Sequence, residues 1–145
     1  AFFAIFAVMI IISRPLVGKA YARYGSKYII CLGLVLFILG LLALGIATTP
    51  LTIILTAPLL GLGYGAAQPA FQALAIKSAP IERAGVSTAT YFLALDISVG
   101  AGSVILALLA SAVGYQYLYM FTAVTMIVAL ALYHIWIKRY TPLEL

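Results

Sequence analysis

The sequence predicts an all-α fold, a polytopic helix bundle that crosses a membrane. Of the 145 residues, 66% are hydrophobic and only 8% are charged, whereas a soluble domain typically carries about 25% charged residues. Uncharged stretches such as 29–47, 50–76 and 97–137 are also long enough to cross a bilayer, which takes about 20 mostly apolar residues. The chain has too little polar surface to cover a water-soluble globule.

A single transmembrane domain over residues 1–145 is expected, with five helices at about 1–13, 28–47, 52–76, 84–110 and 117–138. The first apolar run is too short to span a bilayer before Arg14 interrupts it. We therefore expect the sequence to begin partway through a helix of a longer protein. Turn residues separate the later helices, where the connections read TTP, SAP and VGYQ.

The basic residues support this arrangement, because they fall only in alternate connections. The eight are Arg14, Lys19, Arg23, Lys27, Lys77, Arg83, Lys138 and Arg139. The connections at 48–51 and 111–116 have none. Cytoplasmic segments of membrane proteins are enriched in Lys and Arg, so we expect a multi-pass protein of the cell membrane with its basic connections and C-terminus in the cytoplasm. The net charge of +5 is explained by this topology, and no nucleic-acid partner is expected.

Several classes of activity are disfavoured by the scarcity of reactive residues. The single cysteine, Cys31, permits no internal disulfide. The single histidine, His134, is expected at the membrane interface, although a proton relay is an alternative. Intramembrane aspartyl proteolysis needs two acids, and only Asp96 falls within an expected span. Metal sites need clustered His, Cys or acidic ligands, so we expect no enzyme, no cofactor and no metal site.

The third expected helix carries small and polar residues along one side. Gly61, Gly65, Gln68 and Gln72 follow the spacing i, i+4, i+7, i+11, which places them on one face. Paired small residues let helices approach closely in lipid, and Pro69 removes a backbone hydrogen bond and should kink the helix. The two amides could bind a polar substrate, repair the freed carbonyl or bridge to a neighbouring helix.

The fourth expected helix contains an acid near its middle. Asp96 lies about twelve residues from one end and fourteen from the other, which places it near the bilayer midplane. Gly100, Ser103 and Ala107 follow at i+4, i+7 and i+11. Asp96 should therefore face the bundle or a water-filled cavity rather than lipid.

A carboxylate at this depth needs a reason, because insertion of an acid at a helix centre costs roughly 2.5–3.5 kcal/mol. Protonation, a cationic partner or water would remove this cost. Asp96 could load and release a proton or recognise a cation, or it could only hold helices together. No basic residue is expected at the same depth, because Arg14 is expected near a membrane edge.

The segment RPLVGKAYARYGSK, residues 14–27, resembles the short basic loop of major facilitator superfamily transporters. That loop joins the second and third helices of each six-helix half, and reads Gly, three residues, Asp, Arg or Lys, one residue, Gly, Arg, then Arg or Lys. The matches are Gly18, Arg23, Gly25 and Lys27, and the departures are Ala22 for Asp and Ser26 for Arg. Second-half loops are often degraded, so the resemblance implies the C-terminal half. The missing Asp puts any gating salt bridge that needs it in doubt.

Later segments continue the resemblance. Residues 58–76 are similar to the glycine-rich fourth helix of a half, and residues 79–92 are similar to the connection that follows it. The next helix resembles the fifth of a half, with Gly100 and Gly102, but Ser103 stands where drug-exporting members often have Pro. The antiporter signature is therefore weak. The order of segments implies helices eight to twelve of a twelve-helix transporter, part of one six-helix half.

The resemblance and the midplane acid together favour a secondary active transporter that moves a small molecule by alternating access. Proton coupling and export of a drug-like or metabolite substrate are the preferred form, with a non-transporting structural or regulatory membrane protein as the alternative. The expected pathway residues are Asp96, Gln68 and Gln72, and the expected packing or kink residues are Gly61, Gly65, Pro69, Gly100 and Ser103. The expected partners are the lipid bilayer, a small-molecule substrate, protons and the missing N-terminal helices.

Overall fold

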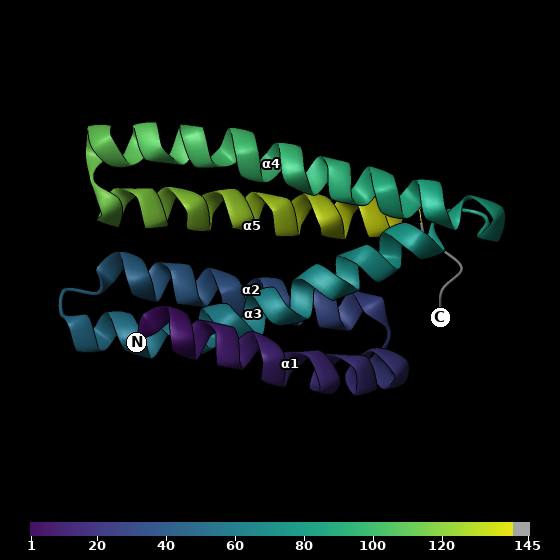
Figure 1. The fold of residues 1–145 in the computed structure, drawn as a ribbon, viewed down its shortest axis with the longest axis horizontal. Coiled ribbons are helices and arrows are strands. Elements are labelled where there is room, and N and C mark those ends of the chain that lie inside the picture. Colours follow the sequence, from purple (N-terminus) through teal and green to yellow (C-terminus); the bar gives the residue numbers. More distant parts are fainter. Residues whose placement is uncertain (141–145) are drawn as a thin grey trace.

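Residues 1–140 are described by the computed structural model, in which long antiparallel helices are joined by short turns (Figure 1). The elements are α1 (Phe2–Tyr24), α2 (Ser26–Ile46), α3 (Pro50–Lys77), the short 3-10 helix η1 (Ile81–Arg83), α4 (Ala84–Val113) and α5 (Tyr115–Tyr140). Each of the five α-helices is long and apolar enough to cross a bilayer. The prediction of an all-α membrane helix bundle is confirmed.

Helix α1 differs most from its expected range. It was expected to end at Ser13, but it continues through Pro15 to Tyr24. A proline is tolerated inside a membrane helix where neighbouring helices and local adjustments satisfy the freed backbone groups. Arg and Lys are also good helix formers, so the charges at 14, 19 and 23 did not mark a loop. They are compatible with a continuous helix.

The prediction of a basic loop over residues 14–27 is therefore wrong. Gly18 and Arg23 lie within α1, and Lys27 lies in the first turn of α2. Gly25 alone separates the two helices, with φ 83° and ψ 169°. Glycine adopts this backbone conformation without the steric penalty that a Cβ would bring, so one residue is enough to reverse the chain.

Helix α3 begins at a defined cap. The Thr49 hydroxyl accepts a hydrogen bond from the backbone N–H of Thr52, and the Thr52 hydroxyl accepts one from the backbone N–H of Thr49. This reciprocal pair satisfies two N–H groups that the start of a helix leaves open. Pro50 occupies the first helical position, where its missing N–H costs nothing. The start of α3 is therefore fixed by four consecutive residues.

Helix α3 lies between α1 and α2 and packs closely against both. A Cβ on Gly63 would lie 2.6 Å from the Phe37 backbone nitrogen of α2, and one on Gly61 would lie 2.6 Å from Met9 Cβ of α1. Such short separations mean that only glycine fits at these crossings. Small residues thus hold the three helices together, as expected where lipid removes the hydrophobic drive for association.

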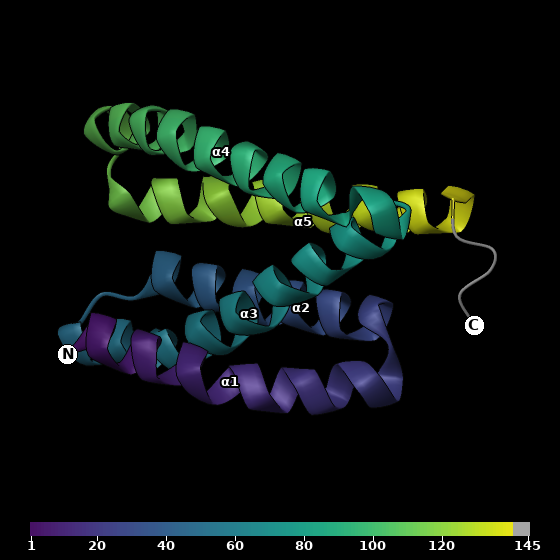
Figure 2. The same cartoon turned by 45° about the vertical axis from the view of Figure 1, so that its right-hand side comes forward.

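Two buried clusters join α2 and α3 to α5. The first, at the basic end, includes Ile30, Ala70 and Tyr133, and the second includes Leu41, Leu60 and Ala123. Helix α4 is different, since none of its residues is buried by the described part of the chain. It lies beside α5 and meets α3 where α3 ends (Figure 2). Most of its surface is therefore open to lipid or to further protein.

Candidate functional site

A pocket of about 510 Å³ lies along α1 and α3, in the halves of these helices nearer the basic end of the bundle. Its polar lining comes from Arg14 of α1 and from Gln68 and Gln72 of α3, and Phe92 of α4 lines it as well. Val17, Gly18, Tyr21, Pro69, Ala70 and Ala73 complete the lining. The structure thus brings both amides of the third helix together with an arginine that sequence reasoning assigned only to topology.

The position of Arg14 follows from the crossing of α1 and α3. Ser13 is only 2% exposed and contacts the position where Gly65 would carry a Cβ. Its hydroxyl donates a hydrogen bond to the Ile10 carbonyl at 2.8 Å, so it needs no partner on α3. Arg14 follows Ser13 directly and lines the same pocket as Gln68 and Gln72 of α3.

The sequence predicted Arg14 near a membrane edge, but the structure places it well inside α1, which continues to Tyr24. It stands eleven residues before the turn at Gly25, or about 16 Å along the helix axis. Asp96 stands twelve residues after the start of α4 at Ala84, or about 18 Å along its axis. The end of α1 and the start of α4 both lie at the basic end of the bundle. Arg14 and Asp96 therefore lie at similar distances from that end.

Helix α3 lacks one backbone hydrogen bond at Pro69, and α4 forms a hydrogen bond to α3 on either side of this residue. Pro69 has no N–H to donate to the carbonyl of Gly65. The Tyr91 hydroxyl donates a hydrogen bond to the Gln68 carbonyl at 3.2 Å, and the Ser87 hydroxyl donates one to the Ala75 carbonyl at 2.5 Å. Ser87 and Tyr91 are four residues apart on one face of α4. The two bonds hold the first part of α4 against the polar half of α3.

Asp96 is not brought into the pocket with Gln68 and Gln72. Its side chain is exposed, and within residues 1–140 it makes no hydrogen bond or ion pair. Asp96 lies one helical turn beyond Phe92 on the same side of α4. It is therefore next to the pocket along α4 but does not line it. Ser103 is also exposed, and a Cβ on Gly100 would meet no atom within 4 Å. The Asp96–Gly100–Ser103 face of α4 is therefore uncovered by the described chain.

The residues of the basic segment have separate surroundings. Gly18 lines the pocket, whereas Arg23 lies over the Tyr24 ring at 5.6 Å. Lys77 of α3 lies over the Tyr21 ring at 5.0 Å. These contacts gather cations and tyrosines at one end of the bundle, an arrangement typical of a membrane interface.

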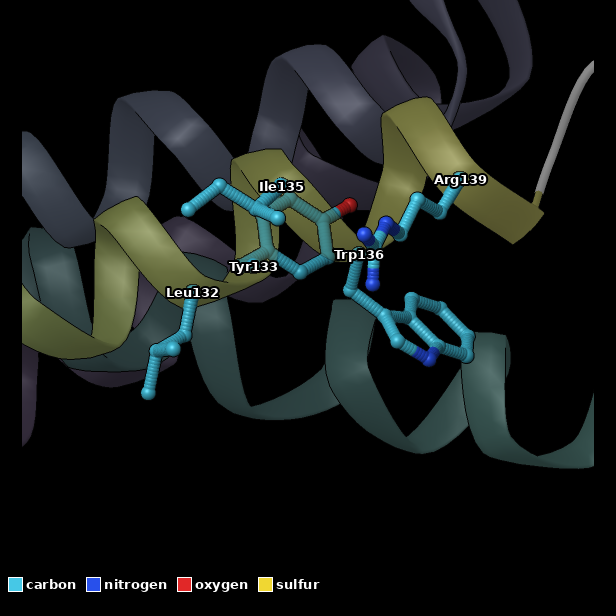
Figure 3. A pocket seen from close by; sticks show the side chains of 5 residues that line it. All are labelled: Leu132, Tyr133, Ile135, Trp136 and Arg139. Carbon is cyan, nitrogen blue, oxygen red and sulfur yellow. The ribbon is translucent and has the colours of Figure 1, made fainter.

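A second, largely apolar pocket lies on α5 at the same end of the bundle (Figure 3). It measures about 430 Å³ and is lined by Leu132, Tyr133, Ile135, Trp136 and Arg139. The side chains of Trp136 and Arg139 lie toward one another in this view. Amphipathic rings beside a cation are characteristic of headgroup depth, so this pocket fits an interfacial belt better than a substrate site.

Comparison with known proteins decides the family. The Major Facilitator Superfamily model matches residues 1–144. The chain belongs to this superfamily. Its resemblance to superfamily transporters, first drawn from the basic segment and the glycine-rich third helix, is thus confirmed over nearly the whole sequence.

The chain is also similar to individual superfamily proteins. It is 29% identical to the uncharacterized MFS-type transporter YhhS of Escherichia coli O6:H1, over 97% of this chain and 35% of that protein. It is 29% identical to the uncharacterized MFS-type transporter MJ1560 of Methanocaldococcus jannaschii, over 84% of this chain and 31% of that protein. The chain thus spans about a third of the length of these relatives. No solved structure gave a significant match.

Family membership and the helices together establish a multi-pass membrane protein of a transporter superfamily. Among the described residues, no group of three or more His, Cys, Asp or Glu side chains could hold a metal ion.

Proposed function

We propose that this chain is the C-terminal part of a secondary active transporter that moves a small molecule by alternating access. The observation that carries the proposal is the pocket of about 510 Å³, which Arg14, Gln68 and Gln72 line within two helices long and apolar enough to cross a membrane. Polar and charged side chains within a membrane-spanning segment raise the free energy of insertion, and where they occur they commonly mark a substrate or ion pathway. In the proposed whole protein, further helices face this pocket and the uncovered side of α4.

The proposed protein lies in the cell membrane with its basic end in the cytoplasm. The turn at Gly25 and the connection between α3 and α4 lie at one end, together with the described cations Arg23, Lys27, Lys77 and Arg83. The turns at 47–49 and at Gly114 lie at the other end and carry no charge. This asymmetry supports the orientation through the positive-inside rule.

Asp96 is proposed to carry the coupling proton, with export as the preferred direction. It is an acid within a membrane-spanning helix and lacks a hydrogen-bond partner among residues 1–140. Protonation would remove the cost of its charge during part of the cycle. Gln68 and Gln72 are proposed to contact the substrate, because their side chains line the pocket.

Transport and coupling are tested together on the full-length protein in lipid vesicles loaded with a metabolite extract from the cells that express it. Mass spectrometry of the outer medium identifies molecules that leave faster than from protein-free vesicles. We expect at least one such molecule, with export that rises when a proton gradient is imposed. If no molecule leaves faster, the protein does not transport and the structural or regulatory alternative is favoured.

Asp96→Asn separates coupling from transport in this assay. We expect the variant to insert normally and to lose the response of export to the proton gradient. Ser98→Ala is the matched control, because Ser98 is exposed on α4 two residues away and its hydroxyl bonds the Ala94 carbonyl of its own helix at 2.7 Å. An unchanged gradient response in Asp96→Asn would exclude Asp96 as the proton carrier.

A further inference from the structure

We infer that the pocket between α1 and α3 binds the carboxylate of an anionic organic substrate, with Arg14 as its cationic anchor. This inference rests on the proposed function, since it names the substrate class of the same pocket. The guanidinium and the two amides supply N–H donors on neighbouring helices, at one place in the membrane-spanning region.

The charge of Arg14 requires a partner. Arginine stays protonated at physiological pH. It therefore cannot become neutral by losing a proton as a lysine can, whereas an acid becomes neutral by gaining one. Insertion scales assign a central arginine roughly 2.5–3.5 kcal/mol. Arginines at such positions almost always pair with an acid or a backbone carbonyl. An unpaired Arg14 in the assembled protein would be exceptional.

The described chain supplies no such partner. Arg14 makes no hydrogen bond or ion pair within residues 1–140. The sequence has three acids. Glu82 lies exposed in η1 at the basic end of the bundle, and Asp96 lies on α4, where it does not line the pocket. Glu144 lies outside the described residues. The anion that meets Arg14 therefore lies outside the described chain. The proposed source is the substrate, whereas an acid on the further helices of the whole protein would be compatible with export of molecules that lack an anionic group.

The chemistry of the lining residues favours a carboxylate as the anion. A planar guanidinium pairs with a carboxylate through two parallel N–H bonds, and the NH₂ groups of Gln68 and Gln72 can donate to its oxygens. A phosphate monoester carries about −1.5 to −2 charges at pH 7, which exceeds what one cation can balance. One arginine with two neutral donors matches a single negative charge.

The rest of the pocket favours an organic body on that carboxylate. Val17, Pro69 and Phe92 give it apolar walls, and about 510 Å³ falls within the range of small-molecule sites, roughly 300–1,000 Å³. Lipid phosphates are a poor alternative, because the Arg14 backbone stands about 16 Å along α1 from the turn at Gly25. The pocket thus fits a small molecule with an apolar body and one carboxylate.

The inference is tested in the same vesicles, loaded with the metabolite extract and containing the full-length protein. We expect the exported molecules to carry a carboxylate, and Arg14→Gln to reduce their export at least tenfold. Arg14→Lys should restore part of that loss, since it keeps the charge but not the paired bonds. Lys19→Gln is the matched control, because Lys19 is exposed on the same helix and does not line the pocket. It should export at the wild-type rate.

Distinct results overturn the inference and the proposed function. No exported molecule at all contradicts transport itself. Export of molecules without an anionic group, or wild-type export by Arg14→Gln, contradicts the inference while leaving transport in place. Recovery of export when Asp96→Asn is added to Arg14→Gln would show that Arg14 pairs with Asp96 instead, which also overturns it.

A second pair of variants keeps the test valid if substitutions of Arg14 prevent insertion. Gln68→Leu and Gln72→Leu remove one amide each and leave the arginine in place. We expect each to raise the half-saturating concentration of the exported carboxylate severalfold with little change in maximal rate. Unchanged half-saturation in both variants would exclude the amides and the proposed carboxylate position.

Discussion

At the residue scale, two tyrosine hydroxyls between the helices differ in whether they form a hydrogen bond. The Tyr91 hydroxyl donates to the Gln68 carbonyl at 3.2 Å and joins α4 to α3. The Tyr133 hydroxyl is buried between helices and has no hydrogen-bond partner in the described part of the chain. The Tyr133 ring still packs edge-on against Phe71 at 5.6 Å between ring centres. The ring of Tyr133 and the hydroxyl of Tyr91 therefore contribute to the stability of the fold, whereas the hydroxyl of Tyr133 does not.

This difference predicts opposite effects for the same substitution at the two tyrosines. Tyr91→Phe should lower stability by about 0.5–1.5 kcal/mol, the net value of one hydrogen bond. Tyr133→Phe should leave stability unchanged or raise it, because a buried hydroxyl without a partner is itself unfavourable by about 1–3 kcal/mol. Thermal unfolding of the full-length protein in detergent measures both. A larger loss for Tyr133→Phe than for Tyr91→Phe would contradict the assignment.

At the element scale, glycines determine how closely the helices approach. A Cβ on Gly63 would stand 2.6 Å from the Phe37 nitrogen and 2.8 Å from the Gly33 carbonyl oxygen, both backbone atoms that cannot swing away. Gly63→Ala should therefore force α2 and α3 apart and destabilise the protein by about 1–3 kcal/mol. Gly85→Ala is the control, since nothing lies within 4 Å of its Cβ position. It should be neutral or slightly stabilising, and equal melting temperatures for the two variants would contradict the close packing.

The same scale shows what the sequence could and could not predict. Apolar runs located α2 to α5 to within a few residues, because hydrocarbon thickness sets both the length and the composition of a span. The end of α1 was missed, since Arg14 and Pro15 interrupt the apolar pattern without ending the helix. The amides of Gln68 and Gln72 were found from their spacing on one helix. The sequence did not predict that Arg14 lines the same pocket as these amides. That arrangement depends on the crossing of α1 and α3 at Ser13 and Gly65, which no local pattern encodes.

At the scale of the whole molecule, the helices form two unequal groups. Helices α1, α2 and α3 pack closely through glycines, and α5 joins them through its contacts with α2 and α3. Helix α4 lies beside α5 and is joined to α3 by the hydrogen bonds of Ser87 and Tyr91 (Figure 2). The pocket lies where the two groups meet, since α1, α3 and α4 all line it. A motion of α4 relative to the rest would therefore change the shape of the pocket directly.

The orientation of the whole bundle gives the last prediction. Thr48 lies exposed between α2 and α3, and Ser78 lies exposed at the opposite end of α3. In a Cys31→Ala background, a membrane-impermeant thiol reagent should label Thr48→Cys in intact cells but Ser78→Cys only after the cells are permeabilised, because Lys and Arg are retained on the cytoplasmic side. Both sites are exposed, and they mark opposite ends of α3. The reverse labelling pattern would place the basic end outside and contradict the proposed orientation.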